Sequence, residues 1–302
     1  MIRTGGSTLA GAEPDPGSSR LPGRRLAITA NLLATSAGTG ARGLAVEAAC
    51  LMTHLALYPT GVLRGRRDTD LDGGYALQRL APLERGLWVH APDAATTPVL
   101  LVHGLIDNRS VFARLRRHLC RRGFRRVVPV QLPLRTASVE DGARVLARMV
   151  ARIAGDDGHV NVIAHSLGGL IARYYVQRMG GDRQVDTLIT LASPHGGTRL
   201  AELVPRPLPY PLLRQLRPDS SLIAELAEPA PGCRTRIIAV AAALDTVVRP
   251  AQATVHHPDL DVVNLTVPGL GHQSLAFSGA VAHQVTTWLA ESAPDAPAPT
   301  AR

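Results

Sequence analysis

Near the middle of the chain the sequence reads Asn161-Val162-Ile163-Ala164-His165-Ser166-Leu167-Gly168-Gly169. An apolar run that suits a buried strand ends at the serine, and a helical pattern follows it. A strand, a tight turn and a helix in this order form a nucleophile elbow, which presents a serine Oγ above the edge of a sheet. The residues two before and two after such a serine must be small, and here they are Ala164 and Gly168. We therefore predict that Ser166 is a nucleophile.

Strands and helices alternate on both sides of this turn. Strands are predicted at 87–90, 99–102, 126–132, 159–164, 185–191, 235–241 and 260–267, and helices at 110–122, 139–153, 167–179 and 273–290. This alternation is typical of an α/β fold with a mostly parallel sheet and helices on both faces. Prolines and leucines interrupt it between residues 199 and 233, which we interpret as a lid-like insertion that supplies an apolar pocket.

The rest of the chain divides by composition. We expect a disordered tail at 1–25, an N-terminal helical segment at 26–82, the α/β domain at 83–290 and a second tail at 291–302. Residues 43–63 are apolar over a length that could span a bilayer, but Glu47, His54 and Tyr58 share one helical face. We interpret the segment as an amphipathic helix that packs on the core or lies on an anionic membrane surface. Arg24-Arg25 precedes a short apolar run that resembles an export signal only weakly, so peripheral membrane, cell-envelope and cytoplasmic locations all stay open.

The composition argues against several classes of protein. The net charge is +9 and all 33 basic residues are arginine, but they are scattered and aromatic residues make up only 3%. We therefore expect no nucleic-acid partner. Three cysteines are too few for a disulfide-dense scaffold, and no two have the spacing of a metal or redox pair. We predict neither a metal nor a cofactor, and the oligomeric state stays open.

A nucleophilic serine needs a base that is held by an acid. His272 ends the Gly-rich stretch Pro268-Gly269-Leu270-Gly271-His272 after the last strand, and Asp245 follows the strand before it. The order Ser, Asp, His is the one that this architecture predicts. Asp259 and Asp261 compete for the role of the acid, but they precede the last strand. His165 adjoins Ser166 in the elbow and is read as a packing residue.

Acyl transfer also needs two N–H donors for the developing oxyanion. One is the backbone N–H of Leu167, directly after the nucleophile. The other is expected from Leu105, in Val102-His103-Gly104-Leu105 at the end of an earlier buried strand.

Together these motifs resemble the bacterial triacylglycerol lipases of the α/β-hydrolase superfamily, over about residues 98–289. The resemblance rests on 102–105, on 164–168, on the turn Ser193-Pro194-His195-Gly196-Gly197-Thr198, on Asp245-Thr246-Val247-Val248 and on Gly271-His272. Ala164 stands where glycine is commoner in the family. The resemblance implies a serine carboxylic-ester hydrolase, a lipase or esterase, that cleaves lipid or other small acyl esters through an acyl-enzyme. His195 in this turn could be catalytic or metal-binding by residue type, but no second metal ligand lies at a useful spacing, so we expect a structural role for it. An acyltransferase with the same triad is the alternative enzyme, and a non-catalytic lipid-binding protein is the alternative of a different class.

Overall fold

The computed structural model describes residues 40–63, 92–105, 107–133, 136–155, 158–203, 205 and 211–291. The predicted strand at 87–90, the tail at 1–25, the export-like run and all but the first residue of the tail at 291–302 lie outside the described residues.

Six parallel strands form one sheet, which confirms the predicted fold class. They are β1 (Val99–Val102), β2 (Val127–Val130), β3 (Val160–His165), β4 (Val185–Leu191), β5 (Arg236–Ala242) and β6 (Val262–Val267), in the order β2-β1-β3-β4-β5-β6. The chain runs outward from β1 to β2 and then returns to β3 on the other side of β1. The carboxyl ends of β1 and β3 therefore flank the point where the winding reverses, which is where sheets of this kind bind ligands.

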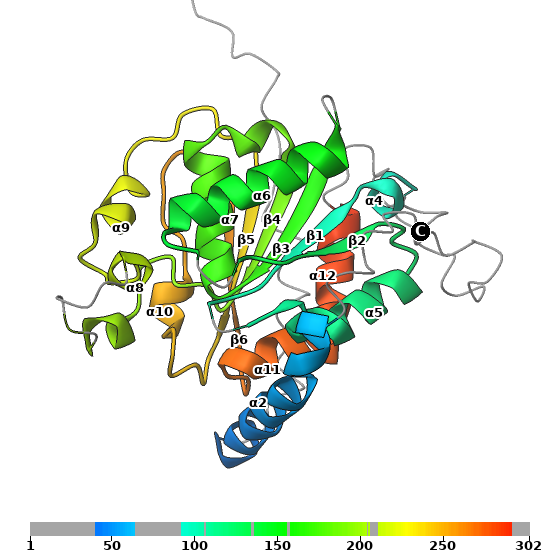
Figure 1. Ribbon diagram of the computed structural model, residues 1–302, viewed down its shortest axis with the longest axis vertical. Helices are drawn as coiled ribbons and strands as arrows, with labels where there is room; N and C mark the ends of the chain where they lie inside the picture. The colour runs from blue at the N-terminus through cyan, green and yellow to red at the C-terminus, as the bar shows by residue number, and fades with distance from the viewer. Residues whose placement is uncertain are drawn as a thin grey trace, which may run out of the picture.

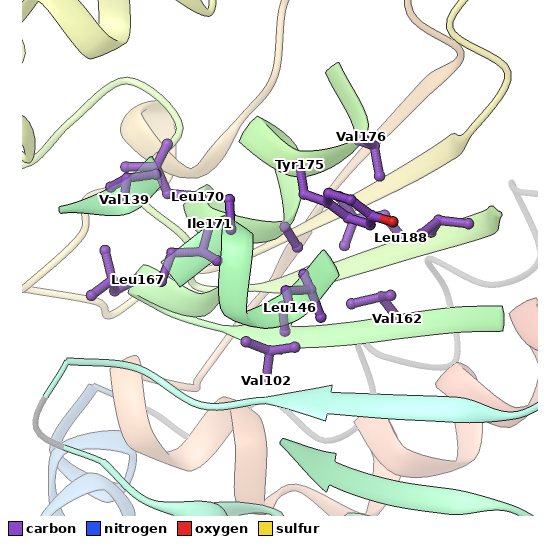
Figure 2. Packing of buried hydrophobic residues seen from close by; sticks show 14 of the residues in the cluster. Val102, Val139, Leu146, Val162, Leu167, Leu170, Ile171, Tyr175, Val176 and Leu188 are labelled. Carbon is purple, nitrogen blue, oxygen red and sulfur yellow. The ribbon is translucent and has the colours of Figure 1, made fainter. Parts of the chain in front are cut away.

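The central strands are buried on both faces because helices cover both. In β1, Leu100 and Val102 face α6 (Val139–Ala154) and α7 (Leu167–Arg178), and Figure 2 shows Val102 among the side chains of that cluster. Val99 and Leu101 face the opposite cluster, which includes α5 (Ala113–Arg121), α11 (His272–Phe277) and α12 (Gly279–Glu291). Figure 1 shows the three layers.

Two helix predictions need correction. The helix expected at 110–122 begins as a 3-10 turn, η3 (Arg109–Phe112), before α5. The single helix expected at 273–290 is wrong, because the backbone of Ser278 is extended and separates α11 from α12. Three short helices complete the body: α4 (Pro92–Thr96), η4 (Gly181–Arg183) and α10 (Pro250–Ala253).

The insertion contains η5 (Arg199–Leu203), α8 (Pro211–Gln215) and α9 (Ser221–Glu225). Its leucines were expected to line an acyl pocket, but Leu212 and Leu216 are buried in the core cluster of α6 and α7. Arg173 of α7 holds this segment by donating to the backbone carbonyl of Leu226. Burial, with the charge of Arg178 second, lowers the pKa of Arg173 to about 10. Leu212 and Leu216 therefore belong to the core, whereas Leu200 and Leu203 of the same insertion are exposed. A lid over the site stays a prediction.

The N-terminal helix α2 (Gly40–Leu63) lies against α11 and η3 and extends beyond the sheet (Figure 1). The structure therefore shows the inner face of α2 packed on the core, which is one of the two predicted alternatives. Val46, Leu51 and Met52 of α2 are exposed, and contact of the helix with a membrane surface stays a prediction. Within the described ranges, none of the helices has the length and apolarity that a bilayer span requires.

Candidate active site

Ser166 stands alone between β3 and α7, at the sharp turn that the sequence predicts. Its φ is 55° and its ψ is −128°, a conformation that a residue with a side chain rarely adopts. The turn is held by its backbone: the N–H of Ser166 donates to the carbonyl of Leu191 at the end of β4, over 2.9 Å. The neighbouring strand thus stabilises the strained residue at the edge of the sheet.

The start of α7 is fitted tightly against the end of β1. A Cβ added to Gly168 would lie 2.4 Å from the carbonyl oxygen of Val102 and 2.7 Å from that of His103. A Cβ added to Gly104 would lie 3.4 Å from Ser166 Oγ. The absence of both side chains lets the loop after β1 pass directly beside the serine hydroxyl.

The structure brings the three predicted catalytic side chains into one hydrogen-bonded relay. His272 Nε2 lies 3.1 Å from Ser166 Oγ, and His272 Nδ1 lies 2.8 Å from Asp245 Oδ2. Because a carboxylate only accepts, Nδ1 carries the ring proton, which leaves Nε2 free to accept from the serine hydroxyl. This geometry suits proton transfer from Ser166 to His272.

Asp245 is fixed by its own backbone neighbours. Its Oδ1 accepts from the N–H groups of Val247 and Val248, each over 2.8 Å, so the buried carboxylate keeps Oδ2 for His272. The competing aspartates lie before β6, at the opposite edge of the sheet. Asp259 Oδ2 accepts from the N–H of Ala230, and Asp261 is exposed. The structure brings neither of them to His272.

His165 is fully buried, as expected of a packing residue, but it does more than pack. Its Nδ1 lies 3.0 Å from Asp107 Oδ2, and its Nε2 lies 3.0 Å from the carbonyl oxygen of His272. Both neighbours are acceptors, a geometry that suits the doubly protonated ring. Burial, the largest single effect, lowers the pKa of His165, but the hydrogen bond and charge of Asp107, the His272 carbonyl and the charge of Asp245 together raise that pKa above its usual value. The pair of His165 and Asp107 therefore supports the backbone of His272.

The two expected oxyanion donors lie at the same edge of the sheet. Leu167 is the first residue of α7, and N–H groups in a first helical turn have no carbonyl partner within the helix. Leu105 follows Gly104 and is exposed. Their role as donors stays a prediction.

His195 lies apart from the relay. It is buried, its Nε2 is 2.9 Å from Thr190 Oγ1, and its carbonyl accepts from Arg173. Burial, with the charge of Arg173 second, holds its pKa well below the usual value. Over the described part of the chain, no three His, Cys, Asp or Glu side chains gather as metal ligands do.

Sequence reasoning missed two carboxylates beside the relay. Asp107 has no spacing that links it to His165, 58 residues away. Glu47 was recognised as polar on an apolar helix, but its partners are the N–H groups of Gln273 and Ser274. The only signal in the sequence was the position of Glu47, a polar residue on an apolar helix. Such a signal does not predict which groups the carboxylate binds.

Comparison with known proteins finds similar chains among hydrolases, and the likeness covers the part of the chain that holds the sheet. Residues 98–222 match the family of palmitoyl protein thioesterases, over less than half of the chain. The structure is similar to the lipase BlEst2 of Bacillus licheniformis, with a TM-score of 0.55 and 17% identity over 66% of this chain and 93% of that one.

Two further solved structures are similar at the same level. The monoacylglycerol lipase of Paleococcus ferrophilus has a TM-score of 0.50 and 16% identity over 65% of this chain and 96% of that one. The phospholipase PlaB of Legionella pneumophila has a TM-score of 0.52 and 16% identity over 66% of this chain, which spans only 61% of the phospholipase. Likeness at such identities establishes the fold, and the chain has the α/β-hydrolase fold that its motifs predict.

Proposed function

We propose that this chain is a serine hydrolase that cleaves carboxylic esters of lipids through an acyl-enzyme. The observation that carries the proposal is the relay from Ser166 through His272 to Asp245, with separations of 3.1 Å and 2.8 Å. The strained turn at Ser166 supports it, since backbone strain of this kind is kept at functional sites.

In the first half of the reaction, Ser166 Oγ attacks the ester carbonyl carbon while its proton passes to His272 Nε2. The C=O electrons move onto the oxygen, and Asp245 stabilises the imidazolium that forms. The C–O bond to the alcohol then breaks, and His272 returns its proton to the departing oxygen. The acyl group is left as an ester on Ser166.

In the second half, water replaces the alcohol. His272 takes a proton from the water as its oxygen attacks the acyl carbon, and the C–O bond to Ser166 then breaks. The proton passes from His272 to Ser166 Oγ, and the carboxylic acid leaves. The two tetrahedral intermediates carry their charge at one oxygen, for which we propose the N–H groups of Leu105 and Leu167 as donors.

The comparisons support an acyl chain from a lipid as the substrate class. The structural neighbours are a lipase, a monoacylglycerol lipase and a phospholipase, and the matching family acts on palmitoyl proteins. Exposed apolar side chains also follow three strand ends at the edge that carries the relay: Leu105 after β1, Leu200 after β4 and Val247 after β5. They would favour an apolar acyl group there.

A long-chain acyl thioester is the second candidate substrate, and the family match at 98–222 favours it. The same groups would act, with a thiol leaving in place of an alcohol. An acyltransferase would use another alcohol in place of water in the second half. A non-catalytic lipid-binding protein would not need the relay.

The first test is covalent labelling of the purified protein by a fluorophosphonate, with hydrolysis of p-nitrophenyl esters of increasing acyl length and of palmitoyl-coenzyme A. We expect one labelled site, lost in Ser166→Ala and kept in Ser221→Ala, which changes an exposed serine at the start of α9. Turnover by Ser166→Ala equal to that of the wild type would contradict the mechanism. Faster turnover of the thioester than of the matched ester would favour the second candidate.

A further inference from the structure

The N-terminal helix α2 reaches the backbone that carries His272. Glu47 Oε1 accepts from the N–H of Gln273 over 2.6 Å, and Glu47 Oε2 accepts from the N–H of Ser274 over 2.9 Å. These are the two residues directly after His272, although they lie 226 and 227 positions from Glu47 in the sequence. One carboxylate thus binds two successive amides of the helical turn that begins with the proposed base.

The contact depends on glycines on both sides. Gly43 lies one turn before Glu47 on α2, and a Cβ there would lie 2.2 Å from Leu244 Cδ1 and 3.0 Å from the carbonyl oxygen of Gly269. A Cβ on Gly271 would lie 2.7 Å from Glu47 Oε2. The helix and the loop approach as closely as they do because neither has a side chain at these positions.

The first N–H groups of a helix have no carbonyl partner within it, so another group must bind them. A carboxylate is the strongest common acceptor for this purpose, and a bidentate one also fixes the orientation of the turn. The carbonyl of His272 is held from the other side by His165 Nε2, over 3.0 Å. The backbone at His272 is therefore fixed at both its carbonyl and the two amides that follow.

From this arrangement we infer that Glu47 is a positioning residue for His272, which makes α2 part of the catalytic apparatus. The inference rests on the proposed function, in which His272 is the base. Asp245 orients the imidazole ring, whereas Glu47 fixes where the backbone places it. The distance from His272 Nε2 to Ser166 Oγ depends on both.

The test compares Glu47→Gln, which keeps the shape but replaces one acceptor oxygen by a donor, with Glu47→Ala and Glu47→Asp. The matched control is Asp259→Asn, which alters another carboxylate that accepts from a backbone N–H, at the opposite edge of the sheet. Misplacing a reacting group by about 1 Å costs about a hundred-fold, so we expect kcat on a p-nitrophenyl ester to fall roughly ten- to a hundred-fold in Glu47→Gln and Glu47→Ala. KM should stay within about two-fold, because on this inference Glu47 acts through the backbone of His272 and not through the substrate. Fluorophosphonate labelling of Ser166 should slow by the same factor, and Glu47→Asp should recover part of the rate.

A double-mutant cycle tests the contact itself. Gly271→Ala should lower kcat by pushing the carboxylate away, and should cost much less in the Glu47→Ala background, where that carboxylate is gone. If Gly271→Ala lowers kcat by the same factor in the wild type and in Glu47→Ala, the inference is overturned. A kcat for Glu47→Gln equal to that of Asp259→Asn would also overturn it. The same holds if the kcat of Glu47→Gln falls only in proportion to the folded fraction of the protein, measured by circular dichroism. Loss of activity in Ser166→Ala with no effect of Glu47→Gln would leave the proposed function standing, while full activity of Ser166→Ala would remove the basis of both.

Discussion

Gly168→Ala should inactivate the site while leaving most of the fold in place. The added Cβ would lie 2.4 Å from the carbonyl oxygen of Val102, whereas ordinary contact begins at 3.4 Å. The shortfall is therefore about 1 Å, and both neighbouring atoms are backbone, so no side chain can rotate away. To make room, the start of α7 has to move away from the end of β1, and Ser166 and Leu167 have to move with it.

The size of the effect follows from that displacement. Moving a reacting group by about 1 Å costs about a hundred-fold in rate, so we expect kcat to fall at least that far. Overpacking of a buried contact destabilises a fold by about 1–3 kcal/mol, which lowers the melting temperature without unfolding the protein. Activity should thus fall much more than stability.

The assay is kcat on a p-nitrophenyl ester together with the rate of fluorophosphonate labelling, each measured well below the melting temperature of the variant. Gly196→Ala is the matched control, because its new Cβ would lie 3.6 Å from the backbone of Gln252, an ordinary contact. Wild-type activity in Gly168→Ala, or an equal loss in Gly196→Ala, would refute the reasoning from close packing.

Three further outcomes follow from the site and the core. Asp245→Asn should lower kcat by roughly ten-thousand-fold, because the wrong tautomer of the base is then held, while Asp261→Asn should leave kcat unchanged; the reverse result would exclude Asp245 as the acid. Leu216→Ala should destabilise the protein by about 2–5 kcal/mol in urea unfolding but keep the ratio of long-chain to short-chain turnover. A changed ratio would show that Leu216 lines the acyl pocket. The raised pKa of His165 predicts a stability contribution that is complete below the usual imidazole pKa of about 6.5 and is lost as the pH rises through the higher pKa of the folded state. Asp107→Asn should remove that pH dependence, as measured by urea unfolding between about pH 5 and about pH 9, on either side of the usual imidazole pKa of about 6.5. An equal response of both proteins to pH would contradict this.

The sequence predicted the sheet well because its central strands are buried on both faces and are rich in apolar residues. The run that forms β1 is continuous and apolar, and the predicted bounds of β1 and β4 match the structure. The order of Ser166, Asp245 and His272 could also be predicted, since each follows a strand whose end lies at the same edge. The break at Ser278 was missed because an apolar helical pattern continues across it. A local signal does exist, since Ser278 Oγ accepts from the N–H of Val281 and so caps the start of α12.

The contacts around the proposed base, His272, could also not be predicted from the sequence. Asp107 and Glu47 act on segments 58 and more than 200 residues away, and no periodicity records such a pairing. The burial of two leucines of the insertion could not be predicted for a related reason. A cluster of leucines outside a regular strand or helix can line a pocket or fill a core, and only the position of α6 and α7 distinguishes the two for Leu212 and Leu216.

The separation of nucleophile and base along the chain has a consequence for biosynthesis. Ser166 and His272 are 106 residues apart, and His272 is the later of the two. At about 5–20 residues per second, a ribosome makes the base roughly 5–20 s after the nucleophile. Until α11 docks, a chain that has already formed the turn at Ser166 lacks the proposed base. On the proposed mechanism, activity therefore requires the completed fold.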